Sequence, residues 1–307
     1  MAEPGWVEAD VPLQEGRVFV VTGANGGLGW ETARVLAQRR ARVVLACRRP
    51  EAGEAAAARI RVLAPGAVVE VEALDLGDLS SVAACAARLA DRLPLLDCLI
   101  NNAGIMGVPR ALTIDGFERQ LAVNHLGHFA LTGRLLPRLL AAPRPRVVTV
   151  TSATYHLGRI NLADLQGEKR YRPWRAYAQS KLANLLFAVE LDRRARAAGS
   201  PLLSAAAHPG YAATGLQVSP ERRLPPALLR FWRWANSHVA QDAFGGALPT
   251  LRAATDPDAR GATLYGPSGP LRGPALPGKV VGRAADPEAA SALWHASQAL
   301  TGVAFDF

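Results

Sequence analysis

The stretch Arg17-Val-Phe-Val-Val-Thr-Gly-Ala-Asn-Gly-Gly-Leu-Gly29 contains the change of pattern that decides the fold. Its first six residues, Arg17 to Thr22, are an apolar run typical of a buried strand. From Leu28 to Arg39 the apolar residues recur at helical spacing. A strand that passes through a glycine-rich turn directly into a helix is typical of the first half of a βαβ unit.

The same alternation of strand and helix continues along the chain. Further strands are predicted at residues 42–46, 68–74, 95–101, 146–152 and 202–207, and further helices at 51–63, 79–92, 116–140, 175–198, 240–254 and 287–300. Near-continuous apolar strands indicate a parallel sheet with both faces covered. Right-handed crossovers then favour a doubly wound, Rossmann-type α/β sheet. We expect a single domain over residues 16–307, after an N-terminal extension at 1–15.

Residues 212–240 and 261–282 depart from this pattern. The first segment is irregular, and within it residues 225–234 combine apolar and aromatic side chains with two arginines. We interpret it as a substrate lid, because long irregular segments inside compact domains are often functional. Packing, a dimer contact and a peripheral membrane contact are the alternatives. The second segment, rich in Gly and Pro, is expected to form a loop with one short strand near Leu264.

The glycine-rich turn has the properties of a phosphate cradle. Glycines let the backbone turn tightly and approach a phosphate, and the following helix presents free N–H groups and its positive end. The spacing of Gly23, Gly27 and Gly29 is G-x-x-x-G-x-G, which differs from the G-x-G-x-x-G of the common dinucleotide fingerprint. The turn also lacks the Lys-Ser/Thr ending of a nucleoside triphosphate loop, which disfavours an ATPase.

Two later strand ends are expected at the same edge of the sheet, where ligands of open α/β folds bind. Asp75 and Leu76 follow the third strand, and the carboxylate is suited either to an adenine amino group or to a turn or helix cap. The run Asn101-Asn-Ala-Gly104 ends the fourth strand. Its small residues would let a flat cofactor lie against the backbone.

Tyr177 and Lys181 form the candidate proton-transfer pair. They stand four residues apart in a predicted helix and so share a face. An ammonium beside a phenol favours the phenolate, so Lys181, helped by a positively charged nicotinamide, is expected to lower the tyrosine pKa toward the working range. Tyr155 and Tyr171 have an arginine at the same offset, and arginine is not tuned in this way. The alternative is an ordinary exposed helix face.

Ser152 and Asn124 complete the candidate site. Ser152 ends the fifth strand, where its hydroxyl could hold a substrate oxygen against Tyr177 or simply cap a turn. Asn124 lies inside a predicted helix, where Asn is a mediocre helix former, so a bound water or backbone carbonyl is expected beside it. His125 and His128 are interpreted as packing or helix-surface residues. No carboxylate has metal-site spacing with them, so we expect no zinc.

Composition limits the classes of partner. The net charge is +9, but the arginines are scattered and no nucleic-acid module is visible, so a basic solvated surface is the interpretation. The three cysteines, Cys47, Cys85 and Cys98, lie in apolar stretches and form no C-x-x-C pair. The chain has no signal-peptide pattern at residues 1–16 and no run of apolar residues long enough to span a membrane. We expect a cytoplasmic protein.

These residues, taken together and in order, resemble the short-chain dehydrogenases/reductases. The motifs are Thr22-Gly-x-x-x-Gly-x-Gly29, Asn101-Asn-Ala-Gly104, Asn124, Ser152, Tyr177-x-x-x-Lys181 and Pro209-Gly210. The run Asn124-His-Leu-Gly-His-Phe129, Leu45-Ala-Cys-Arg48 and the 25-residue step from Ser152 to Tyr177 are similar to the retinol dehydrogenase, WW-domain oxidoreductase and protochlorophyllide reductase-like branch. Gly26 departs from that branch, which often has Ser there.

The resemblance implies a sheet of about seven strands, a homo-oligomer and a role for each site residue. Tyr177 would be the acid/base, Lys181 would also bind the nicotinamide ribose, Ser152 would orient the carbonyl and Asn124 would hold a proton-relay water. The implied cofactor-binding residues are Gly23, Asn25, Gly27, Leu28, Gly29, Arg48, Asp75, Leu76, Asn102, Ala103, Gly104, Tyr177, Lys181, Pro209, Gly210 and Thr214.

The second strand predicts the cofactor. An acidic residue at its end would bind the ribose hydroxyls of NAD, whereas an arginine accommodates the 2′-phosphate of NADP. Here the strand ends in Ala46-Cys-Arg-Arg49, with no acid before Glu51. The prediction is therefore an oxidoreductase that uses NADP(H), with NAD(H) as the alternative, to interconvert a carbonyl and an alcohol on a small hydrophobic substrate. A catalytically silent nucleotide-binding regulator or scaffold on the same fold is the rival hypothesis.

Overall fold

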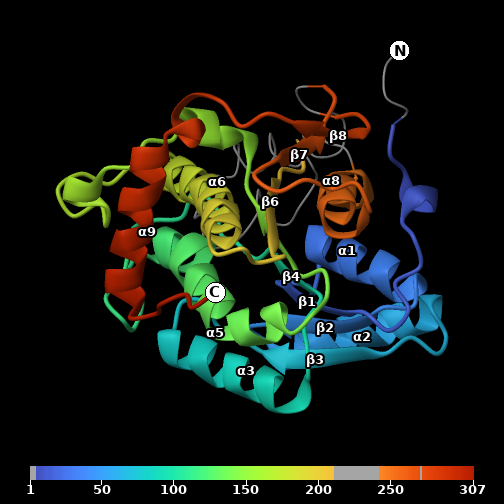
Figure 1. Cartoon of the computed structure of the whole chain (residues 1–307). Helices are drawn as coiled ribbons and strands as arrows, with labels where there is room; N and C mark the ends of the chain where they lie inside the picture. The colour runs from blue at the N-terminus through green and yellow to red at the C-terminus, as the bar shows by residue number, and fades with distance from the viewer. Residues whose placement is uncertain (1–4, 211–241, 270–271) are drawn as a thin grey trace, which may run out of the picture.

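The computed structural model describes residues 5–210, 242–269 and 272–307, and one sheet forms its centre (Figure 1). The eight strands lie in the order β3-β2-β1-β4-β5-β6-β7-β8. All neighbours pair in parallel except β7 and β8, which are antiparallel. The strands are β1 (Val18–Thr22), β2 (Arg42–Cys47), β3 (Val69–Ala73), β4 (Cys98–Asn101), β5 (Arg146–Val150), β6 (Leu203–Ala207), β7 (Leu264–Pro267) and β8 (Ala275–Gly278).

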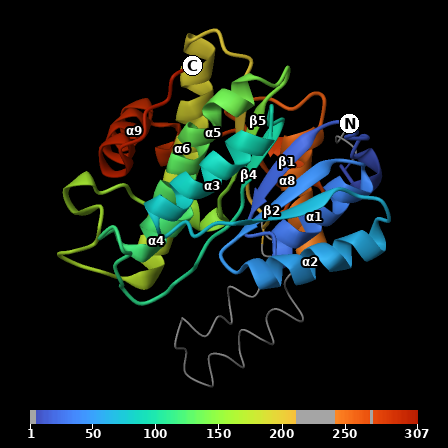
Figure 2. The ribbon, with the colours of Figure 1, turned by 90° about the horizontal axis from the view of Figure 1, so that it is seen from below.

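Helices cover both faces of this sheet, as Figure 2 shows. On one face lie α1 (Gly27–Gln38), α2 (Pro50–Leu63) and α8 (Ala243–Thr255). On the other lie α3 (Leu79–Arg92), α5 (Gly127–Leu140) and α6 (Pro173–Ala197), with α9 (Pro287–Thr301) packed outside α5 and α6. The doubly wound, Rossmann-type architecture is therefore confirmed. Because both faces of β1 and β4 are buried, their residues are apolar without alternation.

The strand order reverses between β1 and β4, since β2 and β3 extend the sheet on one side and β5 to β7 on the other. Ligands of open α/β sheets bind at the carboxyl edge beside such a switch point. The residues that follow β1, β3, β4, β5 and β6 all meet at this edge because these strands are parallel. The fold thus gathers the predicted site residues from distant parts of the chain.

Two segments differ from the sequence prediction. Residues 275–278, predicted as loop, form the eighth strand β8, because their backbone pairs with the otherwise open edge of β7. The helix predicted at 116–140 is divided into α4 (Arg119–Leu121), a π-helix (Ala122–Leu126) and α5. Residues 116–118 precede it, and Glu118 forms a bridge with Leu112.

The N-terminal segment packs against the domain where it is described. Trp6 is buried and forms a bridge with Ala275 of β8. Glu8 accepts hydrogen bonds from Arg34 of α1 and from Arg39 just beyond it. Residues 5–15 therefore cover the α1 side of the domain.

Helix α9 covers the outer side of the two long helices. Trp294 lies in an aromatic cluster with Phe129 of α5, Phe187 of α6 and Phe305. Ser297 of α9 is hydrogen-bonded to the buried His125 at 2.8 Å. A dimer that used this part of α5 and α6 would have to displace α9. None of the helices in the described part of the chain combines the length and apolarity needed to cross a membrane.

Candidate active site

The hydroxyl of Thr22 fastens two turns of the site together. It accepts hydrogen bonds from the backbone N–H groups of Asn102 and Ala103, both at 2.9 Å. The side chain of Asn102 donates to the carbonyl of Thr22 at 2.8 Å. The turn after β1 and the turn after β4 are therefore one hydrogen-bonded unit. Sequence reasoning assigned no such role to Thr22, although a polar residue ending a strand of valines is a visible signal.

The close contact of these two turns explains Gly23. Its backbone has φ = +66°, a left-handed conformation that favours glycine, and a Cβ there would lie 2.9 Å from the Cα of Ala103. Asn25 is half-buried in the turn, Gly27 and Leu28 begin α1, and Gly29 lies in the first turn of this helix.

The start of α1 is suited to a phosphate group. Gly26, the N-cap residue, provides no side-chain cap, and the first turn holds no acidic residue. A Cβ built on Gly26 or Gly27 would meet no atom of the described residues within 4 Å. No described group therefore covers the backbone N–H groups and the positive end of this helix, as a dinucleotide phosphate requires.

Asp75 and Leu76 lie after β3 at the same edge. Asp75 Oδ1 accepts a hydrogen bond from the N–H of Gly77 at 2.9 Å, so the turn interpretation of this carboxylate is realised. The helix cap belongs to Asp78, which accepts from Ser80 and Ser81 at the start of α3. Leu76 is buried, and its backbone packs against Gly127. An adenine contact by Asp75 stays a prediction.

The structure brings the side chains of Tyr177, Lys181 and Ser152 together. Tyr177 and Lys181 are 5% and 4% exposed, and the ammonium lies 5.8 Å from the centre of the phenol ring. A side-chain hydrogen bond joins Tyr177 to Ser152. Ser152 Oγ also accepts from the N–H of Thr154 at 3.3 Å, so the same hydroxyl caps the turn after β5. The structure thus places a half-buried hydroxyl, Ser152, against a buried phenol and ammonium.

Burial sets the pKa of Tyr177 in the protein alone, where it raises this pKa to about 12. The lowering of the same pKa by Lys181 together with a bound nicotinamide stays a prediction. The hydrogen bond with Ser152 acts in the opposite direction but is smaller, since a phenolate removed from water loses more hydration than one hydroxyl returns. Burial likewise lowers the pKa of Lys181 to about 8.

The ammonium of Lys181 has N–H donors that no described residue accepts. Within the described residues its ammonium donates one hydrogen bond, to the carbonyl of Val150 at 3.2 Å. An ammonium carries three donors, and a buried donor without an acceptor is costly. Gly104 lies close by, since a Cβ on it would be 3.4 Å from Lys181 Nζ and 3.1 Å from Asn124 Oδ1. The groups present therefore fit a hydroxyl-bearing ring such as a nicotinamide ribose.

Asn124 lies in the π-helix, where the backbone hydrogen bonds span five residues and the helix widens. Its side chain pairs with the backbone of Ile105, donating to the carbonyl at 2.9 Å and accepting from the N–H at 2.8 Å. The same amide nitrogen donates to Ser180 Oγ at 2.8 Å. A backbone carbonyl beside Asn124 was one of the two predicted partners. The relay water stays a prediction.

His128, interpreted from sequence as a packing or surface residue, is part of the same network. It is buried, and its ring lies between the hydroxyl of Thr22 and the carbonyl of Asn124. Burial lowers the pKa of His128 to about 4, so the ring is neutral at physiological pH. Its position four residues after Asn124, on the same helix face, is the signal that could have identified it.

Three more of the predicted residues follow strands that end at the carboxyl edge of the sheet. Arg48 is exposed directly after β2. Pro209 and Gly210 follow β6 at the same edge, and Gly210 has a left-handed φ of +63°. Thr214 and the predicted lid at 212–240 lie outside the described residues.

Comparison with known proteins shows which family this chain resembles. The family model for short chain dehydrogenases matches residues 17–223. Human retinol dehydrogenase 11 is 44% identical over 239 residues, which are 78% of this chain and 73% of that protein. Mouse polyprenol dehydrogenase is 41% identical over 297 residues, which are 95% of this chain and 86% of that protein. A crystal structure of an uncharacterized protein from Mycobacterium paratuberculosis is 48% identical, with a TM-score of 0.82, covering 99% of this chain and 100% of that one.

Proposed function

Since this chain belongs to the short-chain dehydrogenase family, in its retinol dehydrogenase-like branch, and is an oxidoreductase of alcohol and carbonyl groups, we propose that it uses NADP(H) with Tyr177 as the acid/base group. The observation that carries this proposal is the buried meeting of Tyr177, Ser152 and Lys181 beside the open turn after β1.

The proposed mechanism divides the reaction between cofactor and side chains. A nicotinamide held beside Lys181 would supply a hydride to the substrate carbon, or accept one from it. In the direction of reduction, the hydroxyl of Tyr177 donates its proton to the substrate oxygen, and Ser152 donates a hydrogen bond to the same oxygen. The phenolate left on Tyr177 is stabilised by the ammonium of Lys181 and is reprotonated from solvent. The oxidation direction reverses each of these transfers.

The raised pKa of Tyr177 has a chemical consequence. With a pKa of about 12 the phenol holds its proton firmly, so it is a weak acid and rarely a base near neutral pH. A cation close to the phenol favours the phenolate and lowers this pKa. A positively charged nicotinamide beside Lys181 would supply a second cation, and only the oxidised cofactor carries this charge. We therefore expect the pKa of Tyr177 to fall when NADP⁺ fills the site, as proton removal in the oxidation direction requires.

NADP(H) is proposed over NAD(H) on the charge at the end of β2. Arg48 is exposed there, and no acidic residue stands between Arg42 and Arg49 to bind the free ribose hydroxyls. Arginine suits a 2′-phosphate through paired N–H donors. The Michaelis constants of NADPH and NADH with the same substrate test this preference. We expect a lower value for NADPH, and Arg48→Gln should narrow the difference while Arg49→Gln serves as the matched control.

A hydrophobic alcohol or carbonyl is the proposed substrate class. Trp174 packs edge-on against the ring of Tyr177, with centroids 6.1 Å apart, and is 44% exposed. It therefore brings apolar surface next to the reacting phenol. Two relatives are named retinol dehydrogenase and polyprenol dehydrogenase, and retinol and polyprenols are isoprenoid alcohols. Turnover should thus rise with apolar chain length in a series of linear alcohols or aldehydes.

Tyr177→Phe tests the function itself. The substitution removes one hydroxyl and keeps the ring, so folding and cofactor binding should be retained. NADPH oxidation with a responsive aldehyde should fall on the order of 10²–10⁴-fold, the usual contribution of general acid catalysis. Unchanged turnover would refute the role of Tyr177. A wild-type chain that binds NADPH but reduces no member of an aldehyde and ketone panel would favour the silent-regulator hypothesis.

The surroundings of the enzyme are part of the same proposal. We propose that residues 16–307 form one domain and that residues 212–240 act as its substrate lid. We also propose that the protein is a homo-oligomer and is located in the cytoplasm. The three cysteines are free and buried, which suits a reducing compartment. Since α9 covers α5 and α6, an oligomer would use another surface.

A further inference from the structure

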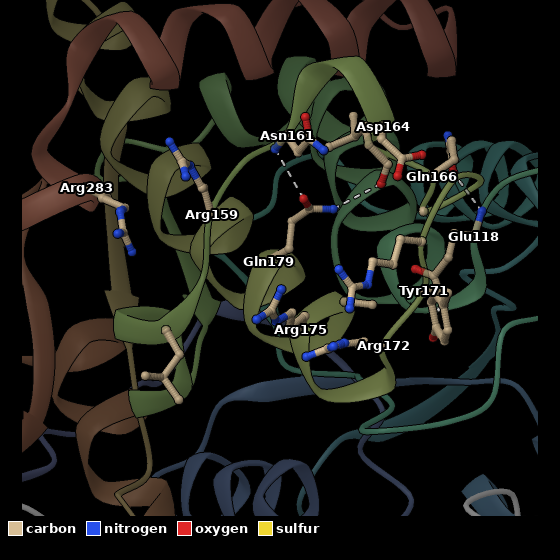
Figure 3. Close-up of a pocket in the computed structure, with 15 residues that line it drawn as sticks. Glu118, Arg159, Asn161, Asp164, Gln166, Tyr171, Arg172, Arg175, Gln179 and Arg283 are labelled. Carbon is tan, nitrogen blue, oxygen red and sulfur yellow. Dashed lines mark hydrogen bonds between the residues drawn. The ribbon is translucent and has the colours of Figure 1, made fainter.

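A cavity of about 410 Å³ lies on the outer side of α6 (Figure 3). Its wall is built largely from the segment between Ser152 and Tyr177, the long step noted in the sequence. The helix residues that line it, from Arg172 to Gln179, recur at helical spacing on the face opposite Tyr177 and Lys181. The cavity is therefore separate from the proposed active site.

Arginines from several segments surround this cavity. They are Arg159, Arg170, Arg172, Arg175 and Arg283. Arg283 donates a hydrogen bond to the carbonyl of Gly158 at 3.2 Å. In the described part of the chain, the guanidinium groups of the other four make no hydrogen bond or ion pair. Four exposed guanidinium groups thus surround one cavity without a partner among the described residues.

The other polar groups of the cavity are already engaged in holding its walls together. Glu118 accepts hydrogen bonds from two backbone N–H groups at the start of α4, and one of its oxygens also accepts from Tyr171. Asp164 accepts from the backbone of residues 168 and 169. Gln179 ties α6 to Asn161 and Leu165, as the dashed lines of Figure 3 show. The two carboxylates of the cavity, which already accept hydrogen bonds within its walls, are therefore outnumbered by its five arginines.

The N-terminus of α6 adds to the excess of positive charge at the cavity. A helix N-terminus carries partial positive charge and favours anions. Here the N-cap is Arg172, which provides no side-chain cap, and the first turn holds Arg175 and no acidic residue. At the other end of the same helix, Arg193 and Arg194 pair with Glu190 at 2.7 Å. The local sequence at the N-terminus opposes helix stability, and such conflicts are expected at functional sites.

We propose that this cavity binds a phosphate group, carried by a small metabolite or by a lipid headgroup. Arg172, Arg175 and the first turn of α6 would hold it, with Arg159 and Arg283 contributed by the facing wall. Guanidinium groups bind phosphate through paired N–H donors, and a helix N-terminus adds its own. The cavity volume lies within the usual range of small-molecule sites, about 300–1,000 Å³.

Calorimetric titration with inorganic pyrophosphate tests the site on the full chain. Saturating NADP⁺ is present, so that pyrophosphate does not compete for the turn after β1. We expect saturable binding to the wild type that weakens at least about tenfold, or 1.4 kcal/mol, in Arg172→Gln/Arg175→Gln. Arg134→Gln/Arg144→Gln removes two exposed arginines from outside the cavity and should bind like the wild type. No binding by the wild type, or equal loss in both variants, would overturn the proposal.

Thermal unfolding provides a second readout that guards against misfolding. Without pyrophosphate, Arg172→Gln/Arg175→Gln should unfold at the wild-type temperature or above, because two cations leave a positive helix end. Pyrophosphate should raise the midpoint of the wild type and leave that of the variant unchanged. Should this variant unfold early, Arg159→Gln/Arg283→Gln on the facing wall takes its place, with the same loss of binding expected.

Vesicles distinguish the two sources of phosphate. Phosphatidylcholine vesicles with and without phosphatidic acid are sedimented with the wild type and the Arg172/Arg175 variant. Retention that needs both phosphatidic acid and the two arginines assigns the site to a lipid headgroup. Pyrophosphate binding without such retention assigns it to a soluble phosphorylated molecule. Retention that survives the substitutions reflects general surface charge and counts against the lipid source.

Discussion

The ring of His128 places Nδ1 3.0 Å from the main-chain carbonyl oxygen of Asn124. Since a carbonyl oxygen only accepts, Nδ1 carries the proton, and the neutral ring then accepts through Nε2. Nε2 lies 2.9 Å from the hydroxyl of Thr22, which donates to it and accepts from two backbone N–H groups. One neutral imidazole therefore joins the turn after β1 to the π-helix.

His128→Phe should weaken both the turn after β1 and the π-helix, which the imidazole ring connects. The ring volume is kept, but the Asn124 carbonyl loses a buried donor, and the Thr22 hydroxyl is left with only the longer bond to the carbonyl of Ile100 at 3.4 Å. Each buried group left unsatisfied costs about 1–3 kcal/mol. We expect a lower unfolding free energy in urea and a weaker affinity for NADPH. His295→Phe, on the exposed side of α9, is the control and should change neither quantity. Wild-type cofactor affinity in His128→Phe would show that the ring is only a packing group.

Acid should destabilise the protein before its carboxylates titrate. Burial lowers the pKa of His128 and His208 to about 4 and that of His125 to about 3. Because these folded-state values lie below the unfolded value, the unfolded chain binds more protons between roughly pH 6.5 and pH 4. The contribution of each buried neutral histidine to the unfolding free energy is fully present above pH 6.5. It is lost as pH falls, by on the order of 2–3 kcal/mol for each histidine.

Urea unfolding at a series of pH values measures this loss. The unfolding free energy should decline steeply from about pH 6.5 to pH 4, and the slope should be shallower in His128→Phe, which lacks one titrating group. A flat profile in the wild type over this range would contradict the buried, neutral state of the three histidines.

Cofactor affinity should depend on the charge of Lys181. Burial lowers its pKa to about 8, so the ammonium is populated below that pH and is lost above it. The dissociation constant of NADPH should therefore rise from about pH 7 to about pH 9, by at most about tenfold per pH unit. Lys181→Arg keeps its charge over this range, so its affinity should be independent of pH. The same pH dependence in both proteins would exclude Lys181 as its source.

Gly104→Ala should weaken cofactor binding while sparing the fold. The new methyl group would lie 3.4 Å from Lys181 Nζ and 3.1 Å from Asn124 Oδ1, in the space proposed for the nicotinamide ribose. We expect the dissociation constant of NADPH to rise about tenfold, which corresponds to about 1.4 kcal/mol. The unfolding temperature measured without cofactor should change little. A loss of stability with intact affinity would place Gly104 among packing residues instead.

Sequence alone determined the order and type of the elements and the chemistry of the site. Strands and helices follow from apolar periodicity, which is local, and the offset of Tyr177 from Lys181 fixes a shared helix face. The glycine turn was equally visible, because the backbone freedom it needs belongs to one residue type. The β8 strand was missed since its pairing with β7 depends on an edge left open by the rest of the sheet.

Tertiary structure decided what burial and distant contacts control. The pKa of Tyr177 is raised because the surrounding protein removes water from the phenol, an effect that no spacing in the chain reveals. The ring of His128 acquires its role from Thr22, which is 106 residues away in sequence and adjacent only after the sheet has formed. Local patterns thus specify elements and candidate groups, whereas desolvation and long-range hydrogen bonds exist only once the elements have packed.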